Sequence, residues 1–143
     1  MVGIRPRDPK SVTFYHGVEL LLKGFLQAVN NVQKDHGLLR VLRCFELKIG
    51  NADNKLATTL APYISSIDSC SLLGNFLAEN CISIDRWYEV LRYPESLNGK
   101  PFSHLVLKWE SIQTCEFWHH MTITAHTLQA EAVSLARNRG WSA

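Results

Sequence analysis

The stretch from Phe102 to Arg139 constrains the fold of this chain most, because it contains neither glycine nor proline. If it forms one helix, its about 38 residues extend roughly 57 Å at about 1.5 Å per residue, far beyond an average helix. A helix that is apolar on two sides usually packs on two sides. Two apolar stripes run along this stretch: Phe102, Leu105, Trp109, Ile112 and Ile123 form the first, and Val106, Phe117, Met121, Leu128 and Leu135 form the second. We expect one side to face its own bundle and the other to face a second subunit in a homodimer.

The rest of the chain also has a helical pattern. It shows no sustained alternation of apolar and polar residues and no Asn-Gly turn between β-branched runs, which are the signals of strands and hairpins. Apolar residues recur instead at helical spacing. The expected helices before the last one cover residues 11–31, 36–49, 53–69 and 72–91. We therefore predict an all-α, up-and-down bundle of four to five helices with a long C-terminal helix.

Local signals mark the ends and interruptions of these helices. Ser11 is a plausible N-cap, and Gly50 with Asn51 closes the second helix. Pro62 divides the third helical region or kinks it, and the poor helix formers at residues 80–83 favour a break in the fourth. Gly24 costs roughly 1 kcal/mol relative to alanine inside the first helix, a cost that the close approach of a neighbouring helix would offset.

Length and charge limit the class of protein. The chain of 143 residues has the size of one domain, and its net charge of +2 is too small for a nucleic-acid binder that works by bulk charge. We expect an N-terminal tail over residues 1–10 and one helical domain over residues 11–140. No signal peptide or apolar run of membrane-spanning length is present, so a cytoplasmic protein without a membrane segment is predicted. Buried, reduced thiols are expected for the four cysteines, which are Cys44, Cys70, Cys81 and Cys115.

The long C-terminal stretch carries the pattern Glu-x-x-His at Glu116 and His119. Di-iron carboxylate proteins present their ligands in this way from bundle helices. His120 and His126 lie nearby, but the sequence has no second Glu-x-x-His motif to complete such a site. These four residues are therefore metal-ligand candidates only, and hydrogen-bonded or interface polar residues are the competing interpretation. No cofactor is predicted.

Other polar residues stand at helix ends and faces. Glu19 and Lys23 are spaced as an ordinary i, i+4 ion pair. Asp35 fits the N-cap of the second helix, where His36 is expected to be exposed. The guanidinium of Arg92 suits phosphate, although an arginine before Tyr93-Pro94 also commonly ties a loop to a helix end.

Three stretches together resemble the HEPN family, the helical domains of higher eukaryotes and prokaryotes that bind nucleotides. FYHGVELLLKGFL (residues 14–26) resembles the first core helix of the family, and KDHGLLRVL (residues 34–42) resembles the entry to its second helix. VLRYPES (residues 90–96) resembles the Arg-Tyr-Pro turn that precedes the long final helix. The three matches occur in the family's order and span residues from about 12 to 138.

The resemblance implies a ligand groove and a set of partners. The groove would be lined by His36, Arg92 and Tyr93, with Glu19 and Lys23 nearby as orienting residues. Many family members are ribonucleases marked by an arginine that a histidine follows after four to six residues, and none of the eight arginines here has such a histidine. The resemblance therefore implies a non-catalytic branch that binds a nucleotide or another phosphate-bearing ligand, forms homodimers, and serves as an accessory or antitoxin-type partner of a nucleotidyltransferase. Two alternatives are a ribonuclease or metal-dependent enzyme with an atypical site, and a purely structural interaction bundle.

Overall fold

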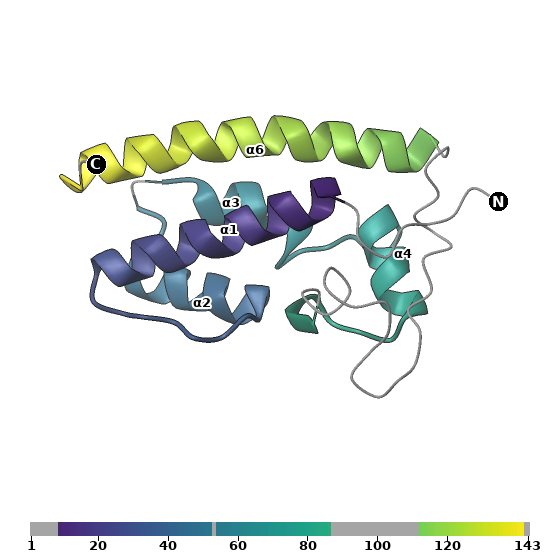
Figure 1. Ribbon diagram of the computed structural model, residues 1–143, viewed down its shortest axis with the longest axis horizontal. Coiled ribbons are helices and arrows are strands. Elements are labelled where there is room, and N and C mark those ends of the chain that lie inside the picture. The colour runs from purple at the N-terminus through teal and green to yellow at the C-terminus, as the bar shows by residue number, and fades with distance from the viewer. Residues whose placement is uncertain (1–8, 53, 87–111, 142–143) are drawn as a thin grey trace.

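The computed structural model describes residues 9–52, 54–86 and 112–141, and within these ranges its regular elements are all helical, with no strand (Figure 1). This confirms the all-α class and the long helix at the C-terminal end. Residues 102–111 of the expected last helix lie outside the described residues. The described elements are α1 (Pro9–Ala28), α2 (Leu38–Lys48), α3 (Leu56–Leu60), the 3-10 turn η1 (Ala61–Tyr63), α4 (Leu72–Glu79), the 3-10 turn η2 (Ile84–Arg86) and α6 (Ile112–Asn138).

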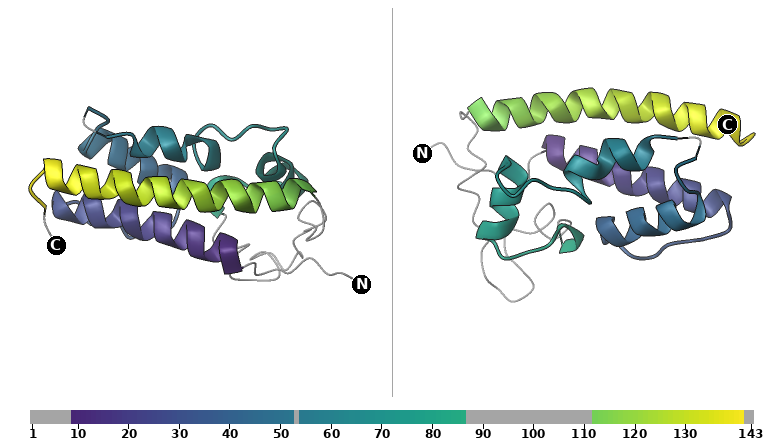
Figure 2. Two further views of the ribbon diagram at one scale, coloured as in Figure 1. Left: turned by 90° about the horizontal axis from the view of Figure 1, so that it is seen from above. Right: turned by 180° about the vertical axis from the view of Figure 1, so that it is seen from behind.

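Helix α6 runs along the length of the bundle and covers it from one side (Figure 1). It contacts α1, α3 and α4, and the view from above shows it lying over the space between α1 and α3 (Figure 2). Helix α2 packs against α1 on the side away from α6. The bundle therefore has α6 as one layer, α1 and α3 beneath it, and α2 as the farthest layer.

Helices α1 and α2 run in the same direction, because the linker between them returns along α1. His36, just before α2, bonds to Glu19 in the middle of α1, whereas Cys44 farther along α2 contacts Asn31 beyond the end of α1. Neighbouring helices of an up-and-down bundle run in opposite directions. Helices α2 and α3 do so, whereas α1 and α2 do not (Figure 2). The nine-residue linker 29–37 is long enough to cross back over several turns of α1.

Four helices end at a residue in the left-handed backbone conformation. After α1, the Asn31 amide donates to the Leu26 carbonyl at 2.8 Å, and after α6 the Trp141 amide donates to the Ala136 carbonyl at 2.7 Å. These six-to-one bonds satisfy carbonyls that a helix end leaves unpaired. The left-handed residues are Asn30 (φ 59°), Gly50 (φ 77°), Cys81 (φ 53°) and Gly140 (φ 72°).

These ends settle the expected helix boundaries. Gly50 closes the second helix as predicted, and the expected break at residues 80–83 is confirmed, because α4 stops at Glu79. The third helical region divides into α3 and η1, which carries Pro62. The expected cap at Ser11 is wrong: α1 begins at Pro9, and proline suits a first turn because its missing N–H would have no partner there.

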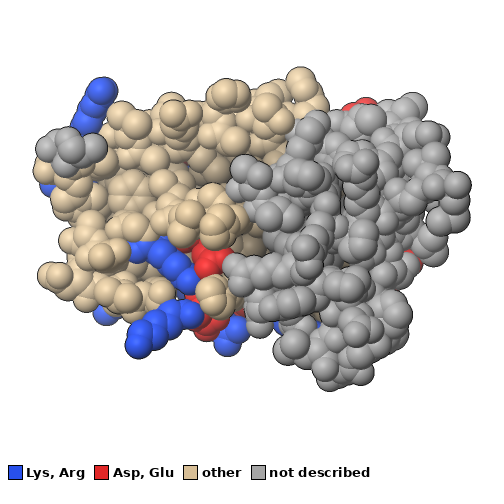
Figure 3. Space-filling view, in the orientation of Figure 1, with Lys and Arg blue, Asp and Glu red and all other residues tan. Residues whose placement is uncertain are grey.

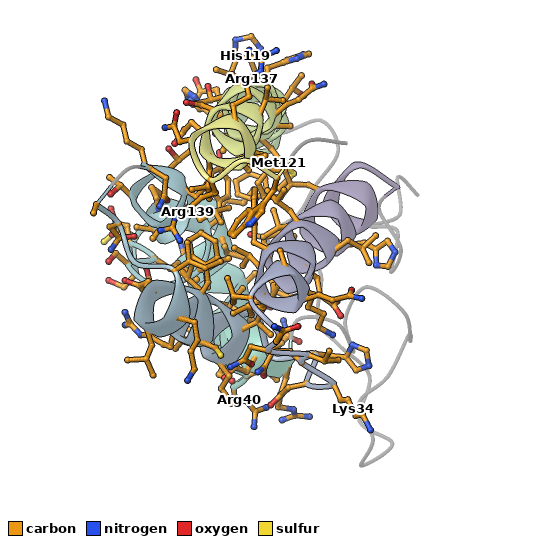
Figure 4. All side chains as sticks on the ribbon, turned by 90° about the vertical axis from the view of Figure 1, so that its left-hand side faces the viewer. Lys34, Arg40, His119, Met121, Arg137 and Arg139 are labelled. Carbon is orange, nitrogen blue, oxygen red and sulfur yellow. The ribbon has the colours of Figure 1, made fainter. Side chains whose placement is uncertain are left out.

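The described side chains of the two expected stripes of α6 differ in burial. Met121, Leu128 and Leu135 of the second stripe are buried, and Met121 points toward the other helices (Figure 4). Ile123 of the first stripe is 50% exposed. The buried stripe lies on α1 and α3, where Leu22, Leu26, Leu56 and Leu60 are fully buried.

The C-terminal end of α6 is tied to the C-terminal end of α2. The Arg139 guanidinium donates to the Ile49 carbonyl at 2.9 Å and lies 5.7 Å from the Trp141 ring centre. Trp141 in turn packs on Phe25, with 5.8 Å between ring centres. A cation at this point also complements the negative end of the α2 dipole.

The cysteines differ from expectation. Cys44 is half-buried, whereas Cys70 and Cys81 are exposed, and the side chain of Cys115 lies outside the described residues. Cys70 occupies the loop before α4, and Cys81 occupies the left-handed position after it. The position of Cys81 follows from the early end of α4, because a continuous helix over 72–91 would have carried Cys81 in its middle. Among the described helices, none combines the length and the apolar character needed to cross a membrane.

The close approach of two backbones occurs at Gly74, not at Gly24. A methyl group at Gly74 would lie 2.2 Å from the Asp68 carbonyl oxygen, and Gly74 is buried. A methyl group at Gly24 would meet nothing within 4 Å. The neighbouring helix expected at Gly24 is therefore absent from the described part of the chain.

The two glycines predict opposite effects of alanine on stability. Gly24→Ala should raise the free energy of unfolding by roughly 1 kcal/mol, because it improves helix propensity without a clash. Gly74→Ala should lower it by about 1–3 kcal/mol, because the backbone of Asp68 must move. Urea titration followed by circular dichroism measures both, and equal effects of the same sign would contradict this interpretation.

Candidate functional site

A buried carboxylate on α1 is the centre of the candidate site. Glu19 is only 7% exposed, at the edge of the apolar face of α1. Its Oε2 atom accepts a hydrogen bond from Lys23 Nζ at 2.8 Å, one turn along the helix, and another from His36 Nδ1 at 2.7 Å. We call Glu19, Lys23 and His36 the Glu19 cluster.

The cluster keeps Glu19 ionised. Burial acts to raise the pKa of Glu19, but the hydrogen bonds and positive charges of Lys23 and His36 outweigh burial and lower the pKa below its ordinary value. Because Glu19 Oε2 bonds to Nδ1 of His36, the carboxylate also fixes where the histidine ring lies. A carboxylate that orients an imidazole through Nδ1 directs the other ring nitrogen away from itself.

A second group of side chains holds the loop that carries His36. The Asp85 Oδ1 atom accepts hydrogen bonds from the backbone amides of Leu39 at 2.7 Å and Arg40 at 3.3 Å. These amides open α2, so Asp85 caps a helix that begins 47 residues earlier in the chain, at Leu38. A carboxylate at this position also interacts favourably with the positive end of the helix dipole.

Arg40 connects this cap to the loop. Its Nε atom lies 3.2 Å from an Asp35 oxygen and 3.4 Å from an Asp85 oxygen. A methyl group at Gly37 would lie 2.7 Å from Arg40 Nε and 2.9 Å from Asp85 Oδ1, so a glycine is needed for this approach. We call Asp35, Arg40 and Asp85 the Asp85 cap.

His36 and Arg40 are more exposed than the carboxylates with which they pair. The side chains of Glu19 and Asp85 are 9% and 19% exposed, against 46% for His36 and 65% for Arg40. Figure 3 shows acidic and basic side chains grouped together below α1 on this face of the molecule. Lys34 and Arg40 extend outward on the side opposite α6 (Figure 4). The arrangement can donate hydrogen bonds to an anion.

The structure joins three of the five sequence-predicted ligand residues. Glu19, Lys23 and His36 meet in one cluster, whereas Arg92 and Tyr93 lie outside the described residues. Asp35 does not cap α2 with its side chain, since its Oδ1 accepts from the Gly37 amide instead, at 2.7 Å. The capping role of Asp85 was missed, because a bond between residues 46 positions apart leaves no local sequence signal.

The four metal-ligand candidates do not converge in this chain. Glu116, His119, His120 and His126 are all exposed on α6, and Figure 4 shows His119 pointing away from the bundle. Within the described residues, no three histidine, cysteine, aspartate or glutamate side chains gather as a metal site would require. The Glu-x-x-His pattern therefore lies on an outer helix face.

Comparison of the chain with protein-family models, with curated proteins and with solved structures finds no match in any of the three. The resemblance to the HEPN family accordingly rests on the three motifs.

The Asp85 cap predicts a stability effect carried by one side chain. Asp85→Ala should lower the free energy of unfolding by about 1 kcal/mol, the usual cost of losing a helix N-cap. Asp68→Ala is the matched control, since Asp68 Oδ1 accepts a hydrogen bond from the Cys70 amide in an exposed turn. This substitution should cost less. A larger loss for Asp68→Ala in urea titrations would contradict the role of Asp85.

The Glu19 cluster predicts a pH-dependent contribution to stability. Glu19→Gln should lower the free energy of unfolding near pH 7 by about 2 kcal/mol, because Lys23 and His36 lose their ionised acceptor. The pKa of Glu19 is lower in the folded chain than its ordinary value of 4.5, so the unfolded chain takes up the proton first as the pH falls. The advantage of the wild type over Glu19→Gln should therefore be constant above about pH 5 and should shrink below pH 4.5.

Thermal or urea unfolding of both proteins from neutral to acidic pH measures this difference. Glu46→Gln is the matched control, because Glu46 pairs with Arg43 at 3.2 Å in a more exposed position on α2. An exposed pair is worth less than about 1 kcal/mol. A stability difference for Glu19→Gln that stays constant down to acidic pH would be incompatible with an ionised, hydrogen-bonded Glu19.

Proposed function

We propose that this chain is a non-catalytic helical module that binds a nucleotide or another phosphate-bearing ligand at the Glu19 cluster. One observation carries the proposal. Three positions selected by the resemblance to the HEPN family meet at a single carboxylate oxygen, although His36 stands 17 residues after Glu19. An ion pair that served only the surface of α1 would not need the histidine of a distant loop.

The layering of charge supports a phosphate-bearing ligand. Arg40 and His36 are the more exposed partners of their ion pairs, and Lys34 is exposed in the same loop. Glu19 and Asp85 lie beneath His36 and Arg40 and pair with them directly. A ligand gains most when its phosphate oxygens touch the cations directly, through charge-assisted hydrogen bonds. This fits a chain whose net charge is only +2.

Each residue has a distinct role in the proposal. Glu19 orients His36 and Lys23, and these two with Arg40 donate hydrogen bonds to phosphate. We include Arg92 and Tyr93 in the proposed groove only because the resemblance to the HEPN family implies them. The same resemblance proposes a nucleotidyltransferase as the protein partner, for which the chain would act as an accessory or antitoxin-type subunit.

A second candidate function follows from the short contact between Glu19 and His36. A carboxylate that holds an imidazole by Nδ1 is also the arrangement of a general acid–base pair. The alternative is therefore a ribonuclease with an atypical site. Incubation of the purified chain with structured RNA tests it: cleavage that is lost in His36→Gln would favour the enzyme over the binding module.

Ligand binding is measured by isothermal titration with ATP, ADP, AMP and inorganic phosphate, with adenosine as the ligand that lacks phosphate. We expect binding of the phosphorylated ligands and not of adenosine. Both His36→Gln and Arg40→Gln should weaken it by about tenfold, the effect of losing one hydrogen bond to a charged group.

Arg43→Gln serves as the control for a general loss of positive charge. Arg43 lies on the same helix as Arg40, is similarly exposed and pairs with Glu46 away from the Glu19 cluster. Binding that falls equally in Arg43→Gln and Arg40→Gln would indicate nonspecific attraction. No heat with any phosphorylated ligand would remove the proposal.

A further inference from the structure

The start of α2 is an anion-binding position that a carboxylate of the chain itself occupies. The N-cap residue of α2 is Gly37, which has no side chain with which to cap the helix. The first amides of α2 therefore need an acceptor from another part of the chain, and Asp85 of η2 supplies it. Helix starts also bind phosphate groups, because the same amides and the helix dipole favour negative charge.

The contacts of Asp85 are those that a phosphate group would make. Its Oδ1 atom lies 2.7 Å from the Leu39 amide nitrogen and 3.3 Å from the Arg40 amide nitrogen. Its Oδ2 atom lies 3.4 Å from Nε of the Arg40 guanidinium. Backbone amides at a helix start and a guanidinium are typical donors to phosphate. A phosphate group can replace both carboxylate oxygens and still offer a third oxygen to another donor.

A phosphate group and the Asp85 carboxylate compete for this position. Two carboxylates already offset the single charge of Arg40, since Nε also lies 3.2 Å from an Asp35 oxygen. A phosphate that approached Arg40 with both carboxylates in place would meet a net negative charge, which repels it. The space is also filled, because even a methyl group at Gly37 would lie 2.9 Å from Asp85 Oδ1.

Asp85 is the carboxylate whose departure also frees backbone donors. Asp35 Oδ1 accepts from the Gly37 amide at 2.7 Å, within its own turn. Asp85 belongs to η2, which contacts α2 and carries the buried side chain of Ile84 next to it. Rotation of the Asp85 side chain can therefore withdraw the carboxylate from α2 while Ile84 holds η2 in place.

We propose that Asp85 is an internal competitor of the ligand, and that a phosphate group replaces its carboxylate at the start of α2. This inference rests on the proposed function and adds to it how the site is regulated. The bound phosphate accepts hydrogen bonds from the amides of Leu39 and Arg40 and from the Arg40 guanidinium. The apparent affinity is reduced by the fraction of molecules in which Asp85 has left the position.

Isothermal titration with inorganic phosphate compares the wild type with Asp85→Ala. We expect Asp85→Ala to bind phosphate about tenfold more tightly, as for a position that is vacant in about one wild-type molecule in ten. The same variant should be less stable, because α2 loses its cap. Ordinary damage to a site weakens binding, so a tighter but less stable variant indicates the loss of a competitor.

Two further variants keep this test decisive. Asp85→Asn still offers an amide oxygen to α2, and it should show a smaller gain in affinity if Asp85→Ala does not fold. Asp35→Asn is the matched control for charge, because it removes a carboxylate from Arg40 but leaves the amides of α2 covered by Asp85. It should gain about twofold, as expected for an exposed ion pair.

The backbone amide signals of Leu39 and Arg40 in nuclear magnetic resonance spectra report the exchange of acceptors. Both should shift when phosphate is added to the wild type or to Asp85→Ala. The inference is overturned, and the proposed function stands, if phosphate binds without shifting these signals. The same holds if Asp35→Asn gains as much affinity as Asp85→Ala, or if folded Asp85→Ala binds no more tightly than the wild type. No binding by either protein removes the inference and the proposed function together.

Discussion

The packing of the buried stripe of α6 on α1 and α3 is the contact on which the rest of the structure depends. Met121, Leu128 and Leu135 are buried there, and each lies two helical turns after the one before it. Removing these side chains from water is the main favourable term that holds separate helices together. Because α6 is much longer than α3 or α4, it joins elements that have few contacts with one another.

Helix α2 depends on residues far from it in the chain at both of its ends. Asp85 caps its first amides, and Arg139 donates to the Ile49 carbonyl at its close. Charged caps of this kind match the dipole of a short helix. The Asp85 contact lies beside the loop that carries His36, so the position of the histidine next to Glu19 depends on a contact made by η2.

The Glu19 cluster and the Glu-x-x-His pattern lie on opposite sides of the molecule. The Glu19 cluster lies between α1 and the start of α2, where Lys34 and Arg40 extend away from α6 (Figure 4). Glu116 and His119 of the Glu-x-x-His pattern are exposed on α6, and His119 points away from the bundle.

The sequence by itself determined the helical class, the long last helix and the places where helices stop, because periodicity, proline and glycine act within a few residues of their own positions. The resemblance to the HEPN family selected Glu19, Lys23 and His36 as ligand residues, and helical spacing alone predicted the ion pair of Glu19 with Lys23. Only the tertiary structure decided that α1 and α2 run in the same direction, that Gly74 and not Gly24 is closely approached, and that Cys70 and Cys81 are exposed. It alone placed Asp85 at the start of α2, and it alone buried Met121, Leu128 and Leu135 of α6 while leaving Ile123 exposed. These features depend on contacts between residues tens of positions apart, whose geometry is set by how whole helices pack and not by the preferences of any local segment.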